Sequence, residues 1–579
     1  MKNQSNSVPT NAVPGLITAI DFGPQVRASA YALINGKRRL LGEGIAHYTD
    51  NAPTFDSSIG IDNAIQNLKF NLSAFMGRDE GDITAVSAAT GSRGGRPIPA
   101  LYAGDLSHNQ LIEFESILRA QGFVITSRIG SLGSRFNTKI SAEHLSDEIC
   151  KTRPNLIAIA LTKDRGWEDL SLIIESLRFI VLNQCDTYRP VIAIFYNGNP
   201  DQVLLNAFKG LLEVRFVQLF EQDQELGSAE AISSLNDLYQ SVSIHNWMRE
   251  DKPENIHGAP IVPINVSLGI STLNLSQKLD LSVTSIHSDP AGVCIACARE
   301  GSVNTAIFGY FFNGDCIESV SSLIPIDEIL EWLPLSIDPS DALSYFANKS
   351  ARPWTEPESN SELLLDHAST QFAITKASQT IVEEDFRTDL IVCTGSTFTN
   401  IGRPLQAAIV ALNGLLPSGF SQFAVDRSNT FAAIGGLAAA GYEIDPEDNL
   451  VHVATSLGVR GLDKIGKQAL AVELTTNHGE RIARNISFGS VDRIAWPNSS
   501  AGKIKVWPAG RLDIGAGRGQ AVELKPKIHS GSGGFIVDAR GRPLSFPKEP
   551  LKKKAAILQW LQGSGAYALG SRNTAITRE

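Results

Sequence analysis

The sequence predicts an α/β protein with largely parallel sheets and a β-rich C-terminal region. Three observations support this prediction. Buried apolar strands alternate with amphipathic helices along most of the chain, which is the pattern of α/β layers. Twice, a strand runs into an acidic turn that contains glycine, first at Asp21 and again at Asp289. From about Lys467 onward, short segments of alternating hydrophobicity are separated by glycine, proline and asparagine, which indicates β-structure.

The first part of the chain begins with a strand, a tight Asp-x-Gly turn and a second strand over Leu16–Leu33. Apolar residues then recur at helical spacing over Asp56–Phe75. A buried strand at Ile83–Ala89 leads into the glycine-rich loop Thr90–Pro97.

Strands and helices continue to alternate after this loop. The predicted strands are Phe123–Thr126, Pro154–Leu161 and Val191–Phe195, and the predicted helices are Leu111–Gly122, Trp167–Val181 and Val203–Leu212. This alternation favours a parallel sheet, whose ligands lie at the carboxyl ends of the strands.

A second α/β part repeats the opening pattern in altered form. The strand Leu279–His287 runs into the turn Asp289-Pro-Ala-Gly292, and a later strand, Leu390–Thr394, breaks into a Gly/Ser/Thr turn. A helix at Leu405–Leu415 follows, and the Ala- and Gly-rich segment Thr430–Gly441 predicts a closely packed helix. The β-rich region then ends in a strand at Gly534–Asp538 and a closing helix.

Composition excludes several classes of protein. The 579 residues are 43% hydrophobic and 19% charged, an ordinary globular balance, and the length allows several domains. The net charge of −10 argues against a general nucleic-acid or anionic-membrane binder. No apolar run approaches the length of about 18 residues that a membrane span needs. Because the N-terminal segment also lacks the apolar core of a signal peptide, we expect a cytoplasmic protein with neither nucleic-acid nor membrane partners.

Six cysteines in a chain of this length fit reduced thiols better than a disulfide framework. Cys294 and Cys297 form a lone Cys-x-x-Cys among apolar neighbours, which favours buried thiols over a metal or redox site. The ten histidines show no metal-ligand spacing.

The turn Asp21-Phe-Gly23 has two interpretations. A carboxylate that leaves a buried strand, followed by a glycine that lets the backbone approach a ligand, is one way to cradle a phosphate and its metal. The alternative is an ordinary hairpin with an acidic turn.

Two α/β halves that each begin with such a turn, and a strand that ends in Gly395-Ser-Thr before a helix, resemble the superfamily of actin, sugar kinases and heat-shock chaperone ATPases. The resemblance implies a two-half actin-like ATPase (ribonuclease-H-like) α/β fold with a C-terminal β-rich module and a nucleotide between the halves. With the polar seam before residue 263, it implies a first half at 15–262, a second half at 263–466 and the β-rich module with its closing helix and tail at 467–579. The Asn-, Ser- and Pro-rich composition of residues 1–14 predicts a disordered leader.

The same resemblance implies a site for ATP and Mg²⁺. The implied catalytic residues are Asp21 and Asp289, with Asp21 positioning the Mg²⁺ ion through water. The implied nucleotide-binding residues are Gly23, Arg27, Gly292, Gly395 and Ser396.

The C-terminal motif is more specific. Gly533–Pro547, which includes Asp538-Ala-Arg-Gly-Arg-Pro543, is followed by a helix with Leu558-Gln-Trp560 and resembles the end of the MutL/GlmL family. That family is associated with cobalamin-dependent glutamate mutase and is distinct from the mismatch-repair protein MutL. Further stretches that agree in order are Thr90–Pro97, Asn197–Asn199, Thr394–Pro404, Val425–Asp426 and Ile434–Ala438.

The turns depart from the family pattern where hydroxyl groups or glycines are expected. The departures are Pro24, Gln25, Val26, Ala291, Cys294, Ile295 and Ser396. Each hydrogen bond lost from a charged phosphate is worth about 1.5–3 kcal/mol, so we expect a weak ATPase at most.

Two functions therefore stay open. The first is a nucleotide-dependent chaperone or reactivase for a cobalamin-dependent mutase or another client protein, favoured by the retained Asp21 and Asp289. The second is a catalytically degenerate, non-hydrolysing scaffold or interaction protein, favoured by the altered turns. Asp538, Arg540 and Arg542 either bind a partner or an anion, or form a structural clamp.

Overall fold

The computed structural model describes the chain in pieces. The main ones are residues 16–22, 25–47, 57–76, 98–104, 123–129, 154–160, 190–196, 214–218, 261–290, 292–309, 326–352, 354–379, 386–495, 502–525 and 533–567, with shorter pieces between residues 49 and 242 and at 381. The predictions for the leader 1–14, the strand Ile83–Ala89 and the helices Trp167–Val181 and Val203–Leu212 lie outside the described residues.

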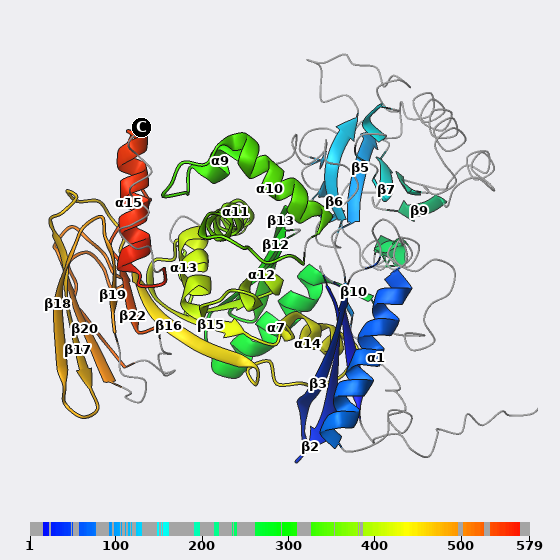
Figure 1. Cartoon of the computed structure of the whole chain (residues 1–579), viewed down its shortest axis with the longest axis horizontal. Helices are drawn as coiled ribbons and strands as arrows, with labels where there is room; N and C mark the ends of the chain where they lie inside the picture. The colour runs from blue at the N-terminus through cyan, green and yellow to red at the C-terminus, as the bar shows by residue number, and fades with distance from the viewer. Residues whose placement is uncertain are drawn as a thin grey trace, which may run out of the picture. The chain divides into compact units, whose positions relative to one another are not determined.

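The chain divides into two compact units (Figure 1). The first comprises Met1–Gly36, Leu40–Val266 and Ala439–Gly441, and the second comprises Lys37–Arg39, Ser267–Ala438 and Tyr442–Glu579. Each unit is described separately below.

The first unit contains a five-stranded sheet in the order β10-β4-β1-β2-β3. Its strands are β1 Ile17–Phe22, β2 Gln25–Ile34, β3 Lys37–His47, β4 Ser92–Gly94 and β10 Ile261–Pro263. β1 is antiparallel to β2 and parallel to β4, and β4 is parallel to β10. The two residues between β2 and β3, Asn35 and Gly36, both have positive φ, as tight hairpin turns require. The helix α1 (Ser57–Met76) packs on β2.

A second sheet lies between β4 and β10 in the sequence of this unit. Its strands are β5 Ile98–Gly104, β6 Phe123–Ile129, β7 Leu156–Ala160, β8 Val191–Tyr196 and β9 Val214–Gln218. Their order is β6-β5-β7-β8-β9 and every neighbouring pair is parallel. This is the order of a doubly wound sheet of the flavodoxin type. The predicted strands within 123–126, 154–161 and 191–195 are confirmed.

The second unit is built on an eight-stranded sheet in the order β13-β12-β11-β14-β15-β16-β22-β19. Its strands are β11 Val283–Asp289, β12 Gly292–Arg299, β13 Ser302–Gly309, β14 Leu390–Thr394, β15 Gly419–Asp426, β16 Leu450–Gly458, β19 Val491–Ile494 and β22 Phe535–Asp538. Its helices are α7 Ile264–Leu279, α9 Ile326–Leu330, α10 Pro339–Ala351, α11 Asn360–Ser378, α12 Ser396–Thr399, α13 Pro404–Leu415, α14 Phe431–Ala439 and α15 Pro550–Gly563.

The strand order identifies the fold. In the first sheet, and again in strands β11 to β15, successive strands are arranged 3-2-1-4-5. The first two strands form an antiparallel hairpin, and strands 1, 4 and 5 are parallel. This arrangement is the ribonuclease-H-like fold, and two copies of it make the actin-like ATPase fold. The predicted fold class is therefore confirmed.

The region after Lys467 is β-rich as predicted, but its strands belong to two sheets. β17 (Gln468–Thr476), β18 (Arg481–Ser487), β20 (Gly502–Pro508) and β21 (Val522–Leu524) form a four-stranded antiparallel sheet. β22 instead pairs in parallel with β16, and β19 pairs with β22. All four residues of β22 are buried, so this strand needs a covered place inside a larger sheet.

Close helix packing in the second unit depends on a glycine of α14, as the Ala- and Gly-rich segment predicts. A Cβ atom at Gly435 would lie 1.8 Å from the carbonyl oxygen of Ser267 on α7. Beside it, the hydroxyl of Ser271 donates a hydrogen bond of 2.6 Å to the carbonyl of Phe431. Figure 1 shows α7 and α14 next to each other. Only a residue without a side chain allows the two backbones to come this close.

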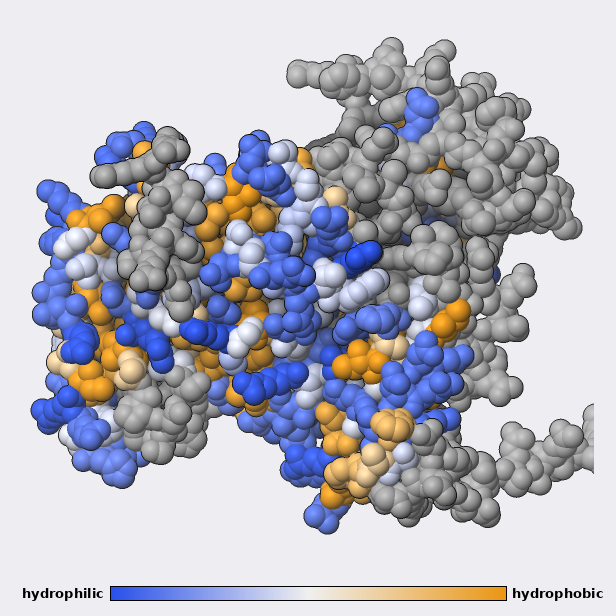
Figure 2. All heavy atoms as spheres, in the orientation of Figure 1, coloured by the Kyte–Doolittle hydropathy of each residue, from blue (hydrophilic) through white to orange (hydrophobic). Residues whose placement is uncertain are grey.

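The visible surface mixes hydrophilic residues with smaller hydrophobic patches (Figure 2). None of the described helices combines the length and the hydrophobicity that a membrane span requires.

We predict that Gly435→Ala destabilises the protein by about 1–3 kcal/mol, because the added methyl group overlaps the backbone of α7 and forces the helices apart. Urea unfolding followed by circular dichroism measures the change. Gly402→Ala is the matched control, since a Cβ there meets no atom within 4 Å and should change stability little. Equal stabilities of Gly435→Ala and the wild type would contradict the packing argument.

Candidate functional site

The candidate site of the second unit lies at the carboxyl ends of β11, β14 and β15. These three strands are parallel neighbours, with His287 in register with Thr394 and Cys393 in register with Val425. Their ends, including Asp289 and Gly395, therefore lie at one edge of the sheet, where α/β proteins bind ligands.

The turn after β14 is held against the end of β11. Gly395 has φ 99°, and a Cβ atom there would lie 2.1 Å from the carbonyl oxygen of Ser288. Both facts require glycine at this position. The N–H of Gly395 donates a hydrogen bond of 2.9 Å to Oδ1 of Asn429.

Asp426, at the end of β15, organises the same turn. Its Oδ2 accepts hydrogen bonds from the hydroxyl of Thr394 at 2.8 Å and from the N–H of Phe431 at 2.7 Å. Asp426 is fully buried. The sequence-based set of site residues lacked Asp426 and Asn429. The position of Asp426 as the last residue of a strand parallel to β14 is the signal that could have identified it.

The carboxylate of Asp289 is used within its own hairpin. Asp289 and Gly292 are register partners, and Oδ1 of Asp289 accepts a hydrogen bond of 3.2 Å from the N–H of Gly292. Oδ2 lies 3.6 Å from Nε2 of the buried His287. Of the two residues that connect the strands, Pro290 has no N–H to donate. This hairpin therefore offers fewer backbone donors to a phosphate than a glycine-rich turn does.

Two hydroxyl groups next to the turn provide other donors. The Oγ atoms of Ser288 and Ser396 are buried and have no hydrogen-bond partner among the described residues. Buried polar atoms are normally satisfied, so these hydroxyls are suited to binding a polar ligand.

The cysteines of β12 are free thiols. Burial, assisted by the charge of Asp289, raises the pKa of Cys294 far above its usual range, and burial raises the pKa of Cys297 to about 11. Three positions apart on a strand, the two side chains point to opposite faces, so they cannot ligate one metal ion together. Within the described parts of the chain, no three His, Cys, Asp or Glu side chains are grouped to hold a metal.

In the first unit, the predicted site residues are only partly described. Asp21 is the penultimate residue of β1 and is 1% exposed. Arg27, its register partner on β2, forms an ion pair of 2.5 Å with Glu43 of β3. Gly23 lies outside the described residues. The structure thus gives Arg27 a structural partner within the sheet.

Asp538, Arg540 and Arg542 form a buried cluster at the end of β22. Arg540 donates two hydrogen bonds to the carboxylate of Asp538, at 2.7 and 2.6 Å, and Arg542 donates one at 2.6 Å. Arg542 also donates a bond of 2.9 Å to the carbonyl of Leu416, just after α13. This arrangement is that of a structural clamp, which ties β22 to the end of α13.

The clamp extends to the closing helix α15. The guanidinium carbon of Arg540 lies 4.9 Å from the ring centre of Trp560. The indole N–H of Trp560 donates a hydrogen bond of 2.7 Å to the carbonyl of Gly489. Burial alone would raise the pKa of Asp538, but the charges and hydrogen bonds of the two arginines lower it well below its usual range. The carboxylate is therefore ionised in the folded protein at neutral pH.

The comparisons with known proteins find low-scoring structural similarity and no match by sequence. No family model and no curated protein sequence matches the chain. A solved glycerol dehydratase reactivase is 10% identical over 74% of this chain and 100% of that chain, with a TM-score of 0.28. Component A of the (R)-2-hydroxyglutaryl-CoA dehydratase from Acidaminococcus fermentans is 7% identical over 74% of this chain and 97% of that chain, with a TM-score of 0.26. Since these scores are low, the fold assignment rests on the strand order.

We predict that Asp538→Asn destabilises the protein by about 3–5 kcal/mol, because two buried arginines lose their counter-charge. Urea unfolding at pH 7 measures the change. The matched control is Glu523→Gln, which removes an exposed carboxylate that also pairs with two basic side chains, Lys503 and Lys505, and should leave the unfolding midpoint unchanged.

The clamp also predicts a pH dependence. The folded-state pKa of Asp538 lies below its unfolded value of about 3.9, so the stabilisation is complete above pH 4–5 and decreases as the pH falls below about 4. The difference in stability between the wild type and Asp538→Asn should therefore shrink on acidification. A difference that stays constant down to pH 3 would show that the carboxylate charge is not responsible.

Proposed function

We propose that this protein is a MutL/GlmL-like accessory protein that acts as a non-hydrolysing scaffold on an actin-like fold. Its partner would be a client protein, with a cobalamin-dependent mutase as the candidate that the sequence resemblance supplies. We place this activity in the cytoplasm, in keeping with the sequence-based expectation.

The observation that supports the proposal best is the hairpin at Asp289, whose carboxylate accepts a hydrogen bond from within the hairpin itself. The N–H of Gly292 is bonded to the carboxylate of Asp289, and Pro290 provides no donor. In the other half, Arg27 is paired with Glu43. Hydrolysis depends on preorganised donors around the transferred phosphate, and these turns have lost several of them.

A nucleotide-dependent chaperone or reactivase is the second candidate. The unpartnered hydroxyls of Ser288 and Ser396 next to Gly395 favour it, because they could donate to a nucleotide at the edge of the sheet. The carboxylates of Asp21 and Asp289 are retained. Mg²⁺ is commonly held by one or two carboxylates together with the phosphates of its nucleotide, so Asp21 could hold it through water without a larger cluster of ligands.

Thermal unfolding with Mg-ATP and with Mg-ADP distinguishes the two candidates. A ligand that binds the folded state at 100 times its Kd stabilises the protein by about 2.7 kcal/mol, which a melting curve detects easily. The scaffold proposal predicts no shift at 5 mM nucleotide or, if binding survives, no release of phosphate above the buffer rate. Phosphate release that depends on this protein would overturn it.

Variants then assign any hydrolysis that is found. Asp21→Ala and Asp289→Ala should abolish it if the two carboxylates act as the resemblance implies, whereas Asp341→Ala, in the first turn of α10, should not. Circular dichroism of each variant checks that the fold is intact.

A further inference from the structure

Two loops of the second unit pack against each other at one end of the four-stranded sheet. They are residues 459–467, between β16 and β17, and residues 509–521, between β20 and β21. Arg460 and Asp513 exchange two backbone hydrogen bonds between the loops, at 2.8 and 3.0 Å. A Cβ atom at Gly461 would lie 3.1 Å from the carbonyl oxygen of Arg511. The two loops therefore present one continuous surface, which we call the basic loop surface.

The exposed charges of the basic loop surface are positive. Its five basic residues are all exposed, and they are Arg460, Lys464, Lys467, Arg511 and Arg518. Its two acidic residues are Asp463 and Asp513. The side chain of Asp463 is only 3% exposed and pairs with Lys467 at 2.9 Å. Oδ1 of Asp513 accepts hydrogen bonds from two backbone N–H groups of its own loop, at 2.7 and 3.0 Å. Because both carboxylates are used within the loops, a partner meets mainly positive charge, on a chain whose net charge is −10.

Two aliphatic side chains are exposed on the same surface. Leu462 is 56% exposed and Ile465 is 78% exposed. Backbone hydrogen bonds hold the loop that carries them at both ends. The N–H of Gly461 donates to the carbonyl of Arg542 at 3.2 Å, and the N–H of Gly466 donates to the carbonyl of Phe488 at 2.9 Å. A loop that is fixed in this way loses little conformational freedom when a partner covers its side chains.

We propose that the basic loop surface docks an acidic segment of a partner protein, in which Asp and Glu residues flank aliphatic or aromatic side chains. The carboxylates would pair with the exposed lysines and arginines, and the apolar side chains would cover Leu462 and Ile465. The net charge of −10 favours a protein segment over an anionic membrane, because the rest of the chain repels an extended negative surface. This inference rests on the proposed scaffold role, since it assigns the surface through which a client protein would bind.

Fluorescence anisotropy with the full chain tests the proposal without nucleotide, so a failure here leaves the test by phosphate release unaffected. The probe is a labelled peptide of repeated Leu-Glu-Glu units. We expect saturable binding with a Kd in the micromolar range that weakens at least tenfold between about 50 and 300 mM salt. Peptides with Lys in place of Glu, or Ser in place of Leu, should bind at least tenfold more weakly.

Three results would overturn the proposal. The first is the absence of saturable binding of the Leu-Glu-Glu peptide. The second is equal binding of the peptide that contains Ser, because charge alone would then account for the signal. The third is retention of the protein on phosphatidylserine vesicles without any binding of the peptide, which would assign the surface to a membrane instead.

Substitutions locate the binding. Ile465→Ser and Lys464→Glu should each weaken peptide binding at least tenfold and leave the melting temperature unchanged, because both side chains are exposed. Leu551→Ser is the matched control: Leu551 is also 78% exposed and lies beside a lysine, but this Lys552 is already paired with Glu549. The control should bind the peptide as the wild type does. Unchanged binding in both loop variants, or an equal loss in the control, would overturn the assignment to these loops.

Discussion

The parallel pairing of β11, β14 and β15 is the constraint on which the rest of the second unit depends. It brings the end of each strand to one edge of the sheet and presses the turn at Gly395 against the backbone of Ser288. No other residue fits there, because a side chain would overlap the neighbouring carbonyl. Asp426 and Asn429 then fix the turn through buried hydrogen bonds. The strand pairing thus determines which groups lie together at this edge of the sheet.

Under the proposed function, the fold and the ATPase activity separate at the same edge of the sheet. The backbone arrangement of an actin-like half is complete, but the hairpin at Asp289 satisfies its own N–H group and includes a proline. Binding geometry can survive such changes, whereas phosphoryl transfer needs all its donors in place at once.

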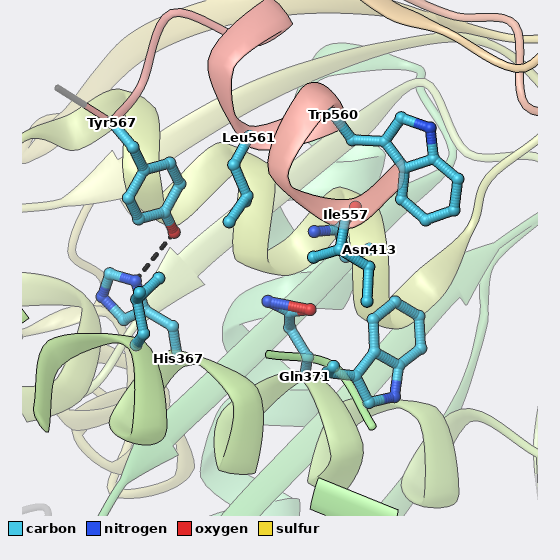
Figure 3. A pocket seen from close by; sticks show the side chains of 9 residues that line it. His367, Gln371, Asn413, Ile557, Trp560, Leu561 and Tyr567 are labelled. Atoms are coloured by element: carbon cyan, nitrogen blue, oxygen red, sulfur yellow. Dashed lines mark hydrogen bonds between the residues drawn. The ribbon is translucent and has the colours of Figure 1, made fainter. Parts of the chain in front are cut away.

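The C-terminal region is bound into the second unit by charge and by sheet pairing. β22 enters the sheet beside β16, and Asp538 holds two arginines that reach Leu416 and Trp560. Because the carboxylate and the guanidinium groups are buried together, losing the carboxylate leaves two buried positive charges without a counter-charge. The closing helix α15 also lines a small pocket together with α11 and α13 (Figure 3).

The sequence by itself determined the α/β class, most described strands, the close packing of α14 and the two acidic turns, because these depend on local hydrophobic periodicity and on glycine. It left open whether Asp538, Arg540 and Arg542 pair with one another, and it indicated neither that the parallel strands β5 to β9 form a sheet separate from that of β1 nor that β22 belongs to the sheet of the second unit. Only the tertiary structure decided these points, since strand order and burial depend on contacts between residues far apart in the chain. Asp426 and Asn429 joined the site for the same reason: their partner turn lies more than thirty residues away.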